Sequence, residues 1–481
     1  MSSIYEVHIP VPSAGGGPPP PASLDRFAPK YLVGNVPAGD DNVAYNTGGF
    51  MYIPDPGDGS GIAIALTQPN GPGDVWLRPG SYSLSTGAPL VVPDNCRLVG
   101  AGRALSIISS DTAAGHSQET LVLGQDSELI GIQVNSGAQA APGAGASRAV
   151  VRVSGAQARV LDCRFILDGT ARTQPWAIWD ATASVEVRNC RFDGNDQAFG
   201  NPSGPSVALA MGPDPLVTPN GYAVGSYEIS DCKFGRASGL TGFNQWLVSY
   251  NASRGDMSDC NGVATRPVGG ALSWVFNGTP SAPPSDQCCN VVDTRVFVTD
   301  DEDVGDTGYT GVSVTNLVTS LILRAFSWDS VQVIYDTIVS PTIPRTGFSI
   351  DSSGNGSIIE SASLVGLVVV GHSRGIRIQT ASGTSAFVAY VRISASVVVN
   401  PQTIGAVVGT GILLTASGAN STRRIGIVNC SVDGAPAGCF GINIATAGVL
   451  DTMVVSNTAV AAGGTAIQDL GTGTNSADNI T

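Results

Sequence analysis

A short pattern of apolar and polar positions recurs along the chain. It reads aliphatic residue, any residue, Asp or Asn, Cys or Thr, any residue, and then Phe or Val. Six copies and one partial copy begin, in order, at Val160, Val187, Ile229, Met257 (the partial copy), Val291, Ile427 and Val455. The Asx positions are 27 residues apart at 162 and 189, and 28 apart at 429 and 457. Self-similarity at such a period predicts a solenoid, in which each repeat forms one turn of a stack.

Each copy is predicted to form a strand, a sharp corner and a second strand. Side chains alternate between the two faces of a strand, and the Asx residue breaks that alternation, because the residues around it resume on the apolar face. Apart from Gly, only Asn and Asp enter the left-handed backbone conformation cheaply, which suits a one-residue corner. The predicted corners are Asp162, Asn189, Asp231, Asp259, Asp293, Asn429 and Asn457.

The same pattern assigns the residues that follow each corner. The Cys or Thr directly after the corner and the Phe or Val two positions later are predicted to fill the interior of each coil. The residue between them would then point outward. The predicted outer row consists of Arg164, Arg191, Lys233 and Arg295.

The chain has nine cysteines, and the pattern explains most of them as interior residues. The odd number, the lack of a secretory signal sequence and the lack of close Cys-x-x-Cys pairs argue against a disulfide framework or a zinc site. The adjacent pair Cys288 and Cys289 is interpreted as reduced thiols whose role stays open. Free cysteine behaves as a small buried hydrophobe, which is the interpretation for Cys163, Cys190, Cys232, Cys260 and Cys430.

Composition agrees with an all-β solenoid. Charged residues make up 13% of the chain, against about a quarter in an ordinary domain. No amphipathic helix of more than about three turns is predicted, whereas strand-like runs bounded by Gly, Asn, Asp or Ser occur throughout. The net charge of −14 disfavours nucleic acid as a partner. No apolar stretch reaches the roughly 18 to 20 residues of a membrane span.

The chain divides into residues 1–72, which carry no copy of the pattern, and the array over 73–481. Residues 13–22 form a Pro- and Gly-rich linker that cannot join a sheet or a helix. The alternating segment before the linker is predicted to be a short strand on a tether, an arm that docks on another protein. Its docking residues would be Ile4, Tyr5, Val7 and Ile9.

The start of the array resembles the first coils of the pectate-lyase superfamily. The resemblance rests on the strand 75–77, the turn 79–82 and the Leu-x-Gly-x-Gly segment 98–102. The Asn-Cys-x-Phe copies are similar to the corner-and-strand pattern of that superfamily, so the resemblance covers about residues 74–481. It implies an all-β fold, a right-handed parallel β-helix (solenoid) with a short irregular N-terminal arm.

The superfamily includes pectin-degrading enzymes, bacteriophage tailspikes, epimerases and non-catalytic virion proteins. A tethered arm before a β-helix resembles a phage spike or decoration protein, and such proteins are usually homotrimers with side-by-side helices. The resemblance implies a place on the virion surface, after synthesis in the host cytoplasm without a signal peptide. A virion protein would hold the arm, and bacterial surface polysaccharide would be a further partner.

The densest group of carboxylates lies in one predicted loop. Its members are Asp300, Asp301, Glu302, Asp303 and Asp306. Such a group could bind Ca²⁺ or supply an acid for sugar cleavage, because neighbouring carboxylates raise one another's proton affinity. The favoured alternative is a solvated acidic loop, and no other cofactor or metal site is predicted. The array histidines His116 and His372 lack a nucleophile motif and are expected on the surface or in turns.

Five aromatic residues are candidates for binding a glycan, because sugar rings present apolar faces that pack on exposed indoles. They are Trp176, Trp179, Trp246, Tyr250 and Trp274. They are close to one another in coil number, so they could share a face. The favoured alternative is that they cover the side of the helix or fill a trimer seam.

Two functions stay open. The favoured one is a structural, host-contact protein of a virion: a trimeric spike, fibre or decoration protein that attaches by its arm and binds polysaccharide. The alternative is an active polysaccharide depolymerase of tailspike type, either a lyase or a glycoside hydrolase. An Arg-x-Pro-x-x-Arg-like lyase motif is absent, with Arg266-Pro267 as the nearest fragment, so the expectation leans away from catalysis.

Overall fold

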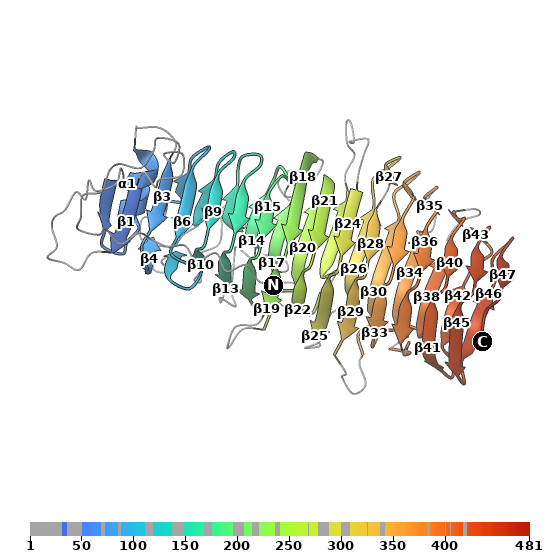
Figure 1. The fold of residues 1–481 in the computed structure, drawn as a ribbon. Helices are drawn as coiled ribbons and strands as arrows, with labels where there is room; N and C mark the ends of the chain where they lie inside the picture. The colour runs from blue at the N-terminus through green and yellow to red at the C-terminus, as the bar shows by residue number, and fades with distance from the viewer. Residues whose placement is uncertain are drawn as a thin grey trace, which may run out of the picture.

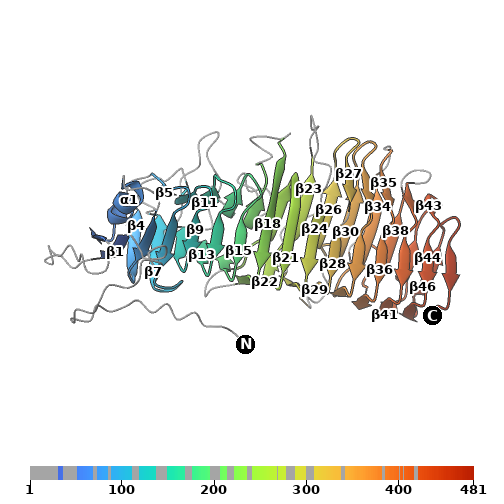
Figure 2. The same cartoon turned by 45° about the horizontal axis from the view of Figure 1, so that its top comes forward.

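A computed structural model describes residues 31–35, 51–68, 73–84, 88–110, 119–136, 149–167, 176–195, 206–213, 221–235, 241–267, 269–277, 288–299, 308–324, 326–336, 342–381, 385–399, 401–404, 406–416 and 421–481. They form a long rod of stacked coils that follow one another from the blue end to the red end (Figure 1, Figure 2). Strands of neighbouring coils pair in parallel: residues 159–161 pair with 186–188, 164–167 with 191–194, and 176–180 with 207–211. The fold is a right-handed parallel β-helix, as the sequence predicted.

Three long sheets form the sides of the rod. Sheet A has 16 strands, in the spatial order β2 (Met51–Asp55), β1 (Tyr31–Asn35), β3 (Asp74–Leu77), β6 (Arg97–Gly100), β9 (Glu128–Ile130), β12 (Arg159–Leu161), β15 (Glu186–Arg188), β18 (Ala223–Ser230), β21 (Ala252–Ser258), β24 (Cys288–Val292), β28 (Ser327–Asp329), β32 (Ser363–Val365), β36 (Arg392–Ser394), β40 (Gly426–Val428), β44 (Met453–Val455) and β47 (Asn475–Ala477).

Sheet B has 13 strands: β4 (Gly80–Leu84), β7 (Ser106–Ser110), β10 (Gln133–Ser136), β13 (Arg164–Leu167), β16 (Arg191–Gly194), β19 (Lys233–Gly235), β22 (Asn261–Thr265), β25 (Arg295–Thr299), β29 (Gln332–Tyr335), β33 (Val368–Val370), β37 (Val397–Val399), β41 (Ser431–Pro436) and β45 (Thr458–Ala462). It follows sheet A after a single corner residue in most coils.

Sheet C also has 13 strands: β5 (Leu90–Val92), β8 (Leu121–Leu123), β11 (Ala149–Val153), β14 (Trp176–Asp180), β17 (Val207–Met211), β20 (Gln245–Tyr250), β23 (Leu272–Phe276), β26 (Tyr309–Asn316), β30 (Arg345–Ser352), β34 (Arg374–Thr380), β38 (Thr410–Thr415), β42 (Phe440–Ile444) and β46 (Thr465–Asp469). A fourth, five-stranded sheet accompanies the later coils: β27 (Ile322–Arg324), β31 (Ile358–Glu360), β35 (Phe387–Ala389), β39 (Thr422–Arg423) and β43 (Val449–Leu450).

The corner between sheets A and B is one residue in the left-handed backbone conformation. Six of the seven predicted corners have φ between 45° and 54°. They are Asp162, Asn189, Asp231, Asp259, Asp293 and Asn429. The prediction for Asn457 is wrong, because Ser456 takes the corner with φ of 55°. Ser330 and Ala395 take the same corner in coils that lack an Asx residue there.

In the six coils whose corner was predicted correctly, the residue after the corner points into the rod, as predicted. Thr458 was also predicted to be inside, but it is only half-buried, because Asn457 takes the interior position of that coil. Burial raises the pKa of the Cys430 thiol, which keeps it neutral. Each thiol donates to the carbonyl two residues earlier, for example Cys190 Sγ to Arg188 O at 3.3 Å. Cys289 is buried as well, whereas the Cys288 side chain lies outside the described part. The predicted interior cysteines are all buried and free: Cys163, Cys190, Cys232, Cys260 and Cys430.

In the last two coils this interior column continues with amides instead of thiols. Asn457 Oδ1 accepts a hydrogen bond from the backbone nitrogen of Cys430 at 2.8 Å. In turn, Asn479 Oδ1 accepts from the backbone nitrogen of Asn457 at 3.0 Å. Each amide also donates to a carbonyl of the preceding coil, at Ile427 and Val454. The amides therefore link the backbones of successive coils.

A second column, on sheet C, consists of glycines. A Cβ at Gly347 would lie 2.6 Å from the carbonyl oxygen of Gly375, and one at Gly375 would lie 2.4 Å from that of Gly411. Gly411 and Gly441 make the same approach to the coil that follows each of them. Only a residue without a side chain allows neighbouring coils to approach this closely.

The stack begins before residue 73, where the array was expected to start. β1 pairs with β2 and with β3, so residues 31–35 and 51–55 already belong to sheet A. Helix α1 (Ser60–Thr67) packs its buried Ile62 and Leu66 on these first coils. The Asp55 carboxylate accepts from the backbone nitrogens of Gly57 and Ile62, at 2.7 and 3.2 Å. The predicted docking arm and its linker lie outside the described residues.

His372 was expected on the surface or in a turn; it lies between β33 and β34, but it is not on the surface. It is fully buried beside the start of β34. Burial disfavours the charged imidazolium and lowers the pKa of His372 to about 3. The imidazole is therefore neutral in the folded protein at ordinary pH.

Candidate functional site

The predicted outer row lies on sheet B and is confirmed by the strand register. Arg164 is aligned with Arg191, Arg191 with Lys233, and Lys233 with Asn261. Asn261 is then aligned with Arg295, and Arg295 with Gln332. Neighbouring strands in a sheet are about 4.8 Å apart, so this row presents one polar side chain per coil along the rod.

Arg164 and Arg191, the first two residues of the row, bind a carboxylate of the protein itself. Asp193, which is fully buried, accepts from Arg164 Nε at 3.0 Å and from Arg191 Nε at 2.8 Å. One buried carboxylate thus joins two guanidinium groups of neighbouring coils by charge-assisted hydrogen bonds. Arg164 and Arg191 are therefore engaged in this structural contact, whereas Lys233 and Arg295 are exposed further along the row.

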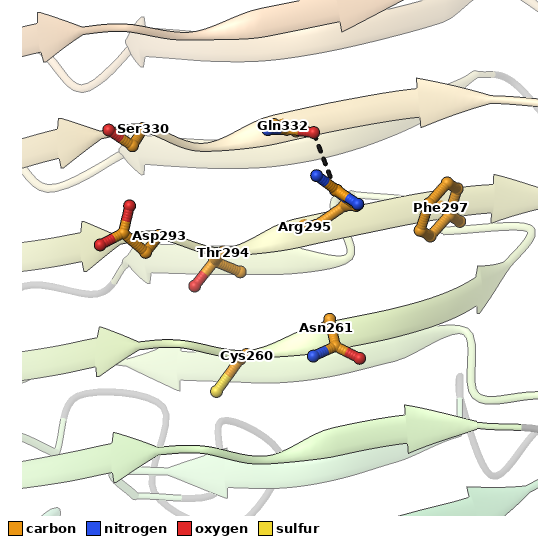
Figure 3. A pocket seen from close by; sticks show the side chains of 8 residues that line it. All are labelled: Cys260, Asn261, Asp293, Thr294, Arg295, Phe297, Ser330 and Gln332. Carbon is orange, nitrogen blue, oxygen red and sulfur yellow. Dashed lines mark hydrogen bonds between the residues drawn. The ribbon is translucent and has the colours of Figure 1, made fainter. Parts of the chain in front are cut away.

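Further along the row, the outer face of sheet B is hollowed into a depression of about 510 Å³ (Figure 3). It spans β22, β25 and β29 and the corners before two of them. The residues that line it are Cys260, Asn261, Asp293, Thr294, Arg295, Phe297, Ser330 and Gln332. Cys260 and Thr294 form its floor, because both are buried.

The depression combines an apolar ring with several polar groups. Figure 3 shows Arg295 beside Gln332 on the next strand, and Arg295 Nε donates to Gln332 Oε1 at 2.8 Å. The ring of Phe297 lies further along the same strand and is 38% exposed. At the opposite end, the left-handed corner turns the Asp293 carboxylate outward. An exposed ring next to amide, guanidinium and carboxylate groups is the arrangement that suits a sugar.

Two of the aromatic residues predicted to bind glycan are inside the rod, so that prediction is wrong for them. Trp246 is fully buried, and its Nε1 donates to Val263 O at 3.1 Å. Trp274 is 1% exposed, and its Nε1 donates to the hydroxyl of buried Tyr227 at 2.8 Å. Neither indole presents a face to a ligand.

The other three aromatics lie together on the outer side of sheet C. Trp176 is 4% exposed, so it offers no open face either and is also a wrong candidate. Trp179 and Tyr250 are half-buried, and Trp179 Nε1 donates to Gly212 O at 2.9 Å. Their packing partners are Ala149, Val207, Ala210 and Val248. This cluster agrees with the alternative that aromatics cover the side of the helix, and glycan binding by Trp179 and Tyr250 stays a prediction.

The acidic segment proposed as a Ca²⁺ or catalytic site, Asp300 to Asp306, lies outside the described residues. It follows directly after β25, the strand that carries Arg295 and Phe297. Among the residues that the structure describes, no group of three or more His, Cys, Asp or Glu could hold a metal ion. A Ca²⁺ site at Asp300 to Asp306 stays a prediction.

A second polar region, which the sequence did not reveal, lies on sheet C. Arg377 donates from Nε and Nη2 to Ser349 Oγ, at 3.2 and 2.9 Å. Burial and then the charge of Arg374 lower the pKa of Arg377, while Asp351 opposes that shift. Asp351 itself accepts from Gln379 on the next strand. Arg374, Arg377 and Asp351 therefore form a charged cluster on this part of sheet C.

The alternation of the sequence places Phe297 on the outer face of the rod. Arg295 was assigned to the outer face, and side chains two apart on a strand share a face. Phe297 therefore had to be outside, with Val296 and Val298 inside, which the burial confirms. In contrast, nothing in the sequence indicated that coils near 330 would leave room for a depression.

Comparisons with known proteins give no family. No family model matches the chain, and no curated protein matches its sequence. In the described parts of the chain, no helix is long and apolar enough to cross a membrane.

Solved structures resemble the chain only distantly. The A-module of mannuronan C-5 epimerase AlgE6 from Azotobacter vinelandii is 14% identical, with a TM-score of 0.36 over 88% of this chain and 95% of that one. Pre-mature gene product 12 of bacteriophage phi29 is 14% identical, with a TM-score of 0.36 over 84% and 53%. Tailspike protein 3 of bacteriophage CBA120 is 12% identical, with a TM-score of 0.32 over 87% and 56%. The chain thus matches only about half the length of the two phage proteins.

Proposed function

We propose that this protein is a host-contact protein on the surface of a phage particle and binds bacterial surface polysaccharide in the depression on sheet B. The depression itself is the observation that carries the proposal. It offers the exposed ring of Phe297 for the apolar face of a sugar, and Asn261, Arg295 and Gln332 for its hydroxyls.

The repeat of the rod supports a polymeric ligand. Asn261, Arg295 and Gln332 lie on three consecutive coils, and each coil advances by about 4.8 Å. That advance is close to the length of one sugar unit in an extended chain. A polysaccharide that runs along the rod would therefore meet one polar side chain with each sugar.

The attachment to a virion rests on the sequence. The alternating segment with Ile4, Tyr5, Val7 and Ile9 and the Pro-rich linker after it suit an arm that docks on another virion protein. The resemblance of the first coils to the pectate-lyase superfamily, which includes tailspikes, supports the same location. A homotrimer of side-by-side rods, made in the host cytoplasm, is part of this proposal.

Glycan binding is tested by titrating the purified full-length protein with size-defined oligosaccharides from bacterial capsules and O-antigens. We expect Phe297→Ala to lower the affinity at least tenfold, because it removes the ring that covers the sugar. Val224→Ala is the matched control: Val224 is an 81% exposed side chain on sheet A and is not among the residues that line the depression, so this change should leave the affinity unaltered. Equal affinity of the wild type and Phe297→Ala would reject the depression as the binding site.

Cleavage of the bound glycan is a second candidate function. One observation favours it: the acidic segment from Asp300 to Asp306 leaves the end of β25, the strand that lines the depression. Carboxylates of this segment could act on a bound sugar as acid and nucleophile or base. The measurement is the size distribution of polysaccharide after incubation with the protein. A loss of size that Asp301→Ala and Glu302→Ala abolish would establish cleavage, and unchanged size would leave binding alone.

A further inference from the structure

The corner between the fourth sheet and sheet A holds two bulky residues in a backbone conformation that disfavours them. On consecutive coils this corner is taken by Ser361, Tyr390, Arg424 and Asp451, with φ between 51° and 63°. Asp enters the left-handed conformation cheaply, whereas Tyr and Arg do not. Strained backbone of this kind is concentrated at sites of function. Tyr390 and Arg424 therefore mark a place where the side chains matter more than the ease of the turn.

The two strained residues contact each other on the surface of the rod. The guanidinium carbon of Arg424 lies 5.2 Å from the centroid of the Tyr390 ring, and Arg424 Nη1 donates to the Tyr390 hydroxyl. Tyr390 is 47% exposed, and Arg424 is exposed as well. Directly before it, Arg423 lies over the ring of Phe387 at 4.2 Å. Two aromatic rings thus hold two guanidinium groups in place.

A third arginine and an open space adjoin this pair on sheet A. Exposed Arg392 on β36 is aligned with Gly426 on β40, and Gly426 lies two residues after Arg424. A Cβ at Gly426 would meet only Met453 Cε, at 3.8 Å. Neither close packing nor a left-handed backbone requires glycine at this position. The missing side chain therefore leaves an opening beside Arg392 and Arg424.

The positive charge around this opening is not neutralised within the protein. Among the residues that the structure describes, Arg392, Arg423 and Arg424 form no ion pair with Asp or Glu. In contrast, Arg324 of the fourth sheet binds Glu360. The neighbouring corner supplies one carboxylate, Asp451. Three guanidinium groups and one carboxylate leave two positive charges in excess here, in a chain whose net charge is −14.

An excess of this size suits a phosphate group better than a single carboxylate. The guanidinium fork binds either group through two parallel hydrogen bonds. A carboxylate carries one negative charge, whereas a phosphate monoester carries about −1.5 to −2 at pH 7 and offers three acceptor oxygens. We propose that Arg392, Arg424 and the opening over Gly426 form a binding site for a phosphate group, either the free ion or an ester carried by a sugar. This site is on sheet A and the depression is on sheet B, so the proposal does not rest on the proposed function.

The test is the ³¹P line width of inorganic phosphate and of glucose 1-phosphate, each titrated with the full-length protein at constant ionic strength. We expect saturable broadening with the wild type. Arg392→Gln and Arg424→Gln should each weaken the affinity by about fivefold or more, because each removes charge-assisted hydrogen bonds. Arg324→Gln is the matched control: it removes the same charge from the fourth sheet, at a residue that already binds Glu360, and it should bind like the wild type.

A second variant tests the opening without changing any charge. Gly426→Leu fills the space over the glycine, so it should weaken the affinity by a similar factor while the far-UV circular dichroism stays unaltered. Broadening of inorganic phosphate alone would assign the site to the free ion, and broadening of both compounds would include the sugar ester. No broadening of either compound would overturn the proposal. So would equal losses in Arg324→Gln and Arg424→Gln, or a Gly426→Leu variant that binds like the wild type. Phe297→Ala should leave phosphate binding unaltered, which separates this site from the depression.

Discussion

The indole of Trp246 stacks on the ring of Phe234 inside the rod, with centroids 4.6 Å apart and planes 7° from parallel. Phe234 stacks on Phe192 at 5.2 Å, and Phe192 on Phe165 at 5.0 Å. The three phenylalanines come from sheet B in consecutive coils, whereas Trp246 comes from β20 on sheet C. Trp246 therefore ends the stack by reaching across the interior.

Removing that last ring should destabilise the rod. We expect Trp246→Ala to lower the free energy of unfolding by about 3 to 5 kcal/mol, because it leaves a cavity next to Phe234. Chemical denaturation followed by circular dichroism measures this change. Phe297→Ala is the matched control, since that ring is on the surface, and it should change stability by no more than about 0.5 kcal/mol. Equal effects of the two variants would contradict the interior position of Trp246.

The corner positions offer a pair of substitutions with opposite effects. Ala395 is held in the left-handed conformation with φ of 51°, which costs a residue with a Cβ roughly 1 to 2 kcal/mol. We expect Ala395→Asn to stabilise the protein by about 1 kcal/mol, because Asn enters this conformation more cheaply. Asp231→Ala, at an equivalent corner with φ of 54°, should destabilise it by a similar amount. Thermal melting of both variants gives the result, and shifts of the same sign would refute this explanation of the corners.

Buried His372 makes stability depend on pH in a defined window. Its folded pKa of about 3 lies below its ordinary value of 6.5, so the unfolded state binds more protons between these pH values. The contribution of His372 to the free energy of unfolding is therefore largest above about pH 6.5. As the pH falls below that value, the free energy of unfolding decreases by about 1.4 kcal/mol per pH unit. We expect His372→Met to remove this slope. The measurement is the free energy of unfolding of both proteins between pH 4 and 7, and parallel curves would show that His372 is not buried in neutral form.

The thiols inside the rod should not react with thiol reagents until the protein unfolds. The chain has nine cysteines, and eight of them are buried: Cys96, Cys163, Cys190, Cys232, Cys260, Cys289, Cys430 and Cys439. Because only an accessible thiolate reacts, we expect a thiol reagent to modify at most Cys288 in the native protein. All nine thiols should react in denaturant. Rapid modification of Cys260, identified by mass spectrometry, would show that the floor of the depression is open.

Much of the fold could be predicted from the sequence, because a solenoid repeats its local rules. Asp162 and Asn189 break the strand alternation, which predicted their corners. The interior position of the cysteine after each corner could be predicted from the same pattern. Ser330 and Ala395 could not be found in this way, because tertiary contacts impose the same backbone conformation on residues that do not favour it. Asn457 was misassigned for a related reason: an amide suits both the corner and the interior column.

The candidate site was harder to predict than the fold. Whether an aromatic residue is inside or outside depends on strand register, and a shift of one residue exchanges the two faces. Trp274 shares one strand face with Leu272 and Phe276, which lie two residues before and after it. Its interior position could therefore be predicted from the sequence. Trp246 and its neighbours Leu247 and Val248 are all buried, and no alternation distinguishes them. A hollow such as the one at Phe297 depends on several coils at once and has no local signature.

The glycine column on sheet C has a consequence for how such a molecule can change its length. Gly347 and Gly375 make equivalent contacts with the coil that follows each of them. Removing one complete lap, the 28 residues from Gly347 through Arg374, would bring Gly375 against the coil of Gly311 with the same close approach. Whole laps are thus interchangeable units, and gene segments that encode them can be lost or duplicated without a new packing problem. The length of the rod can therefore change only in steps of one coil.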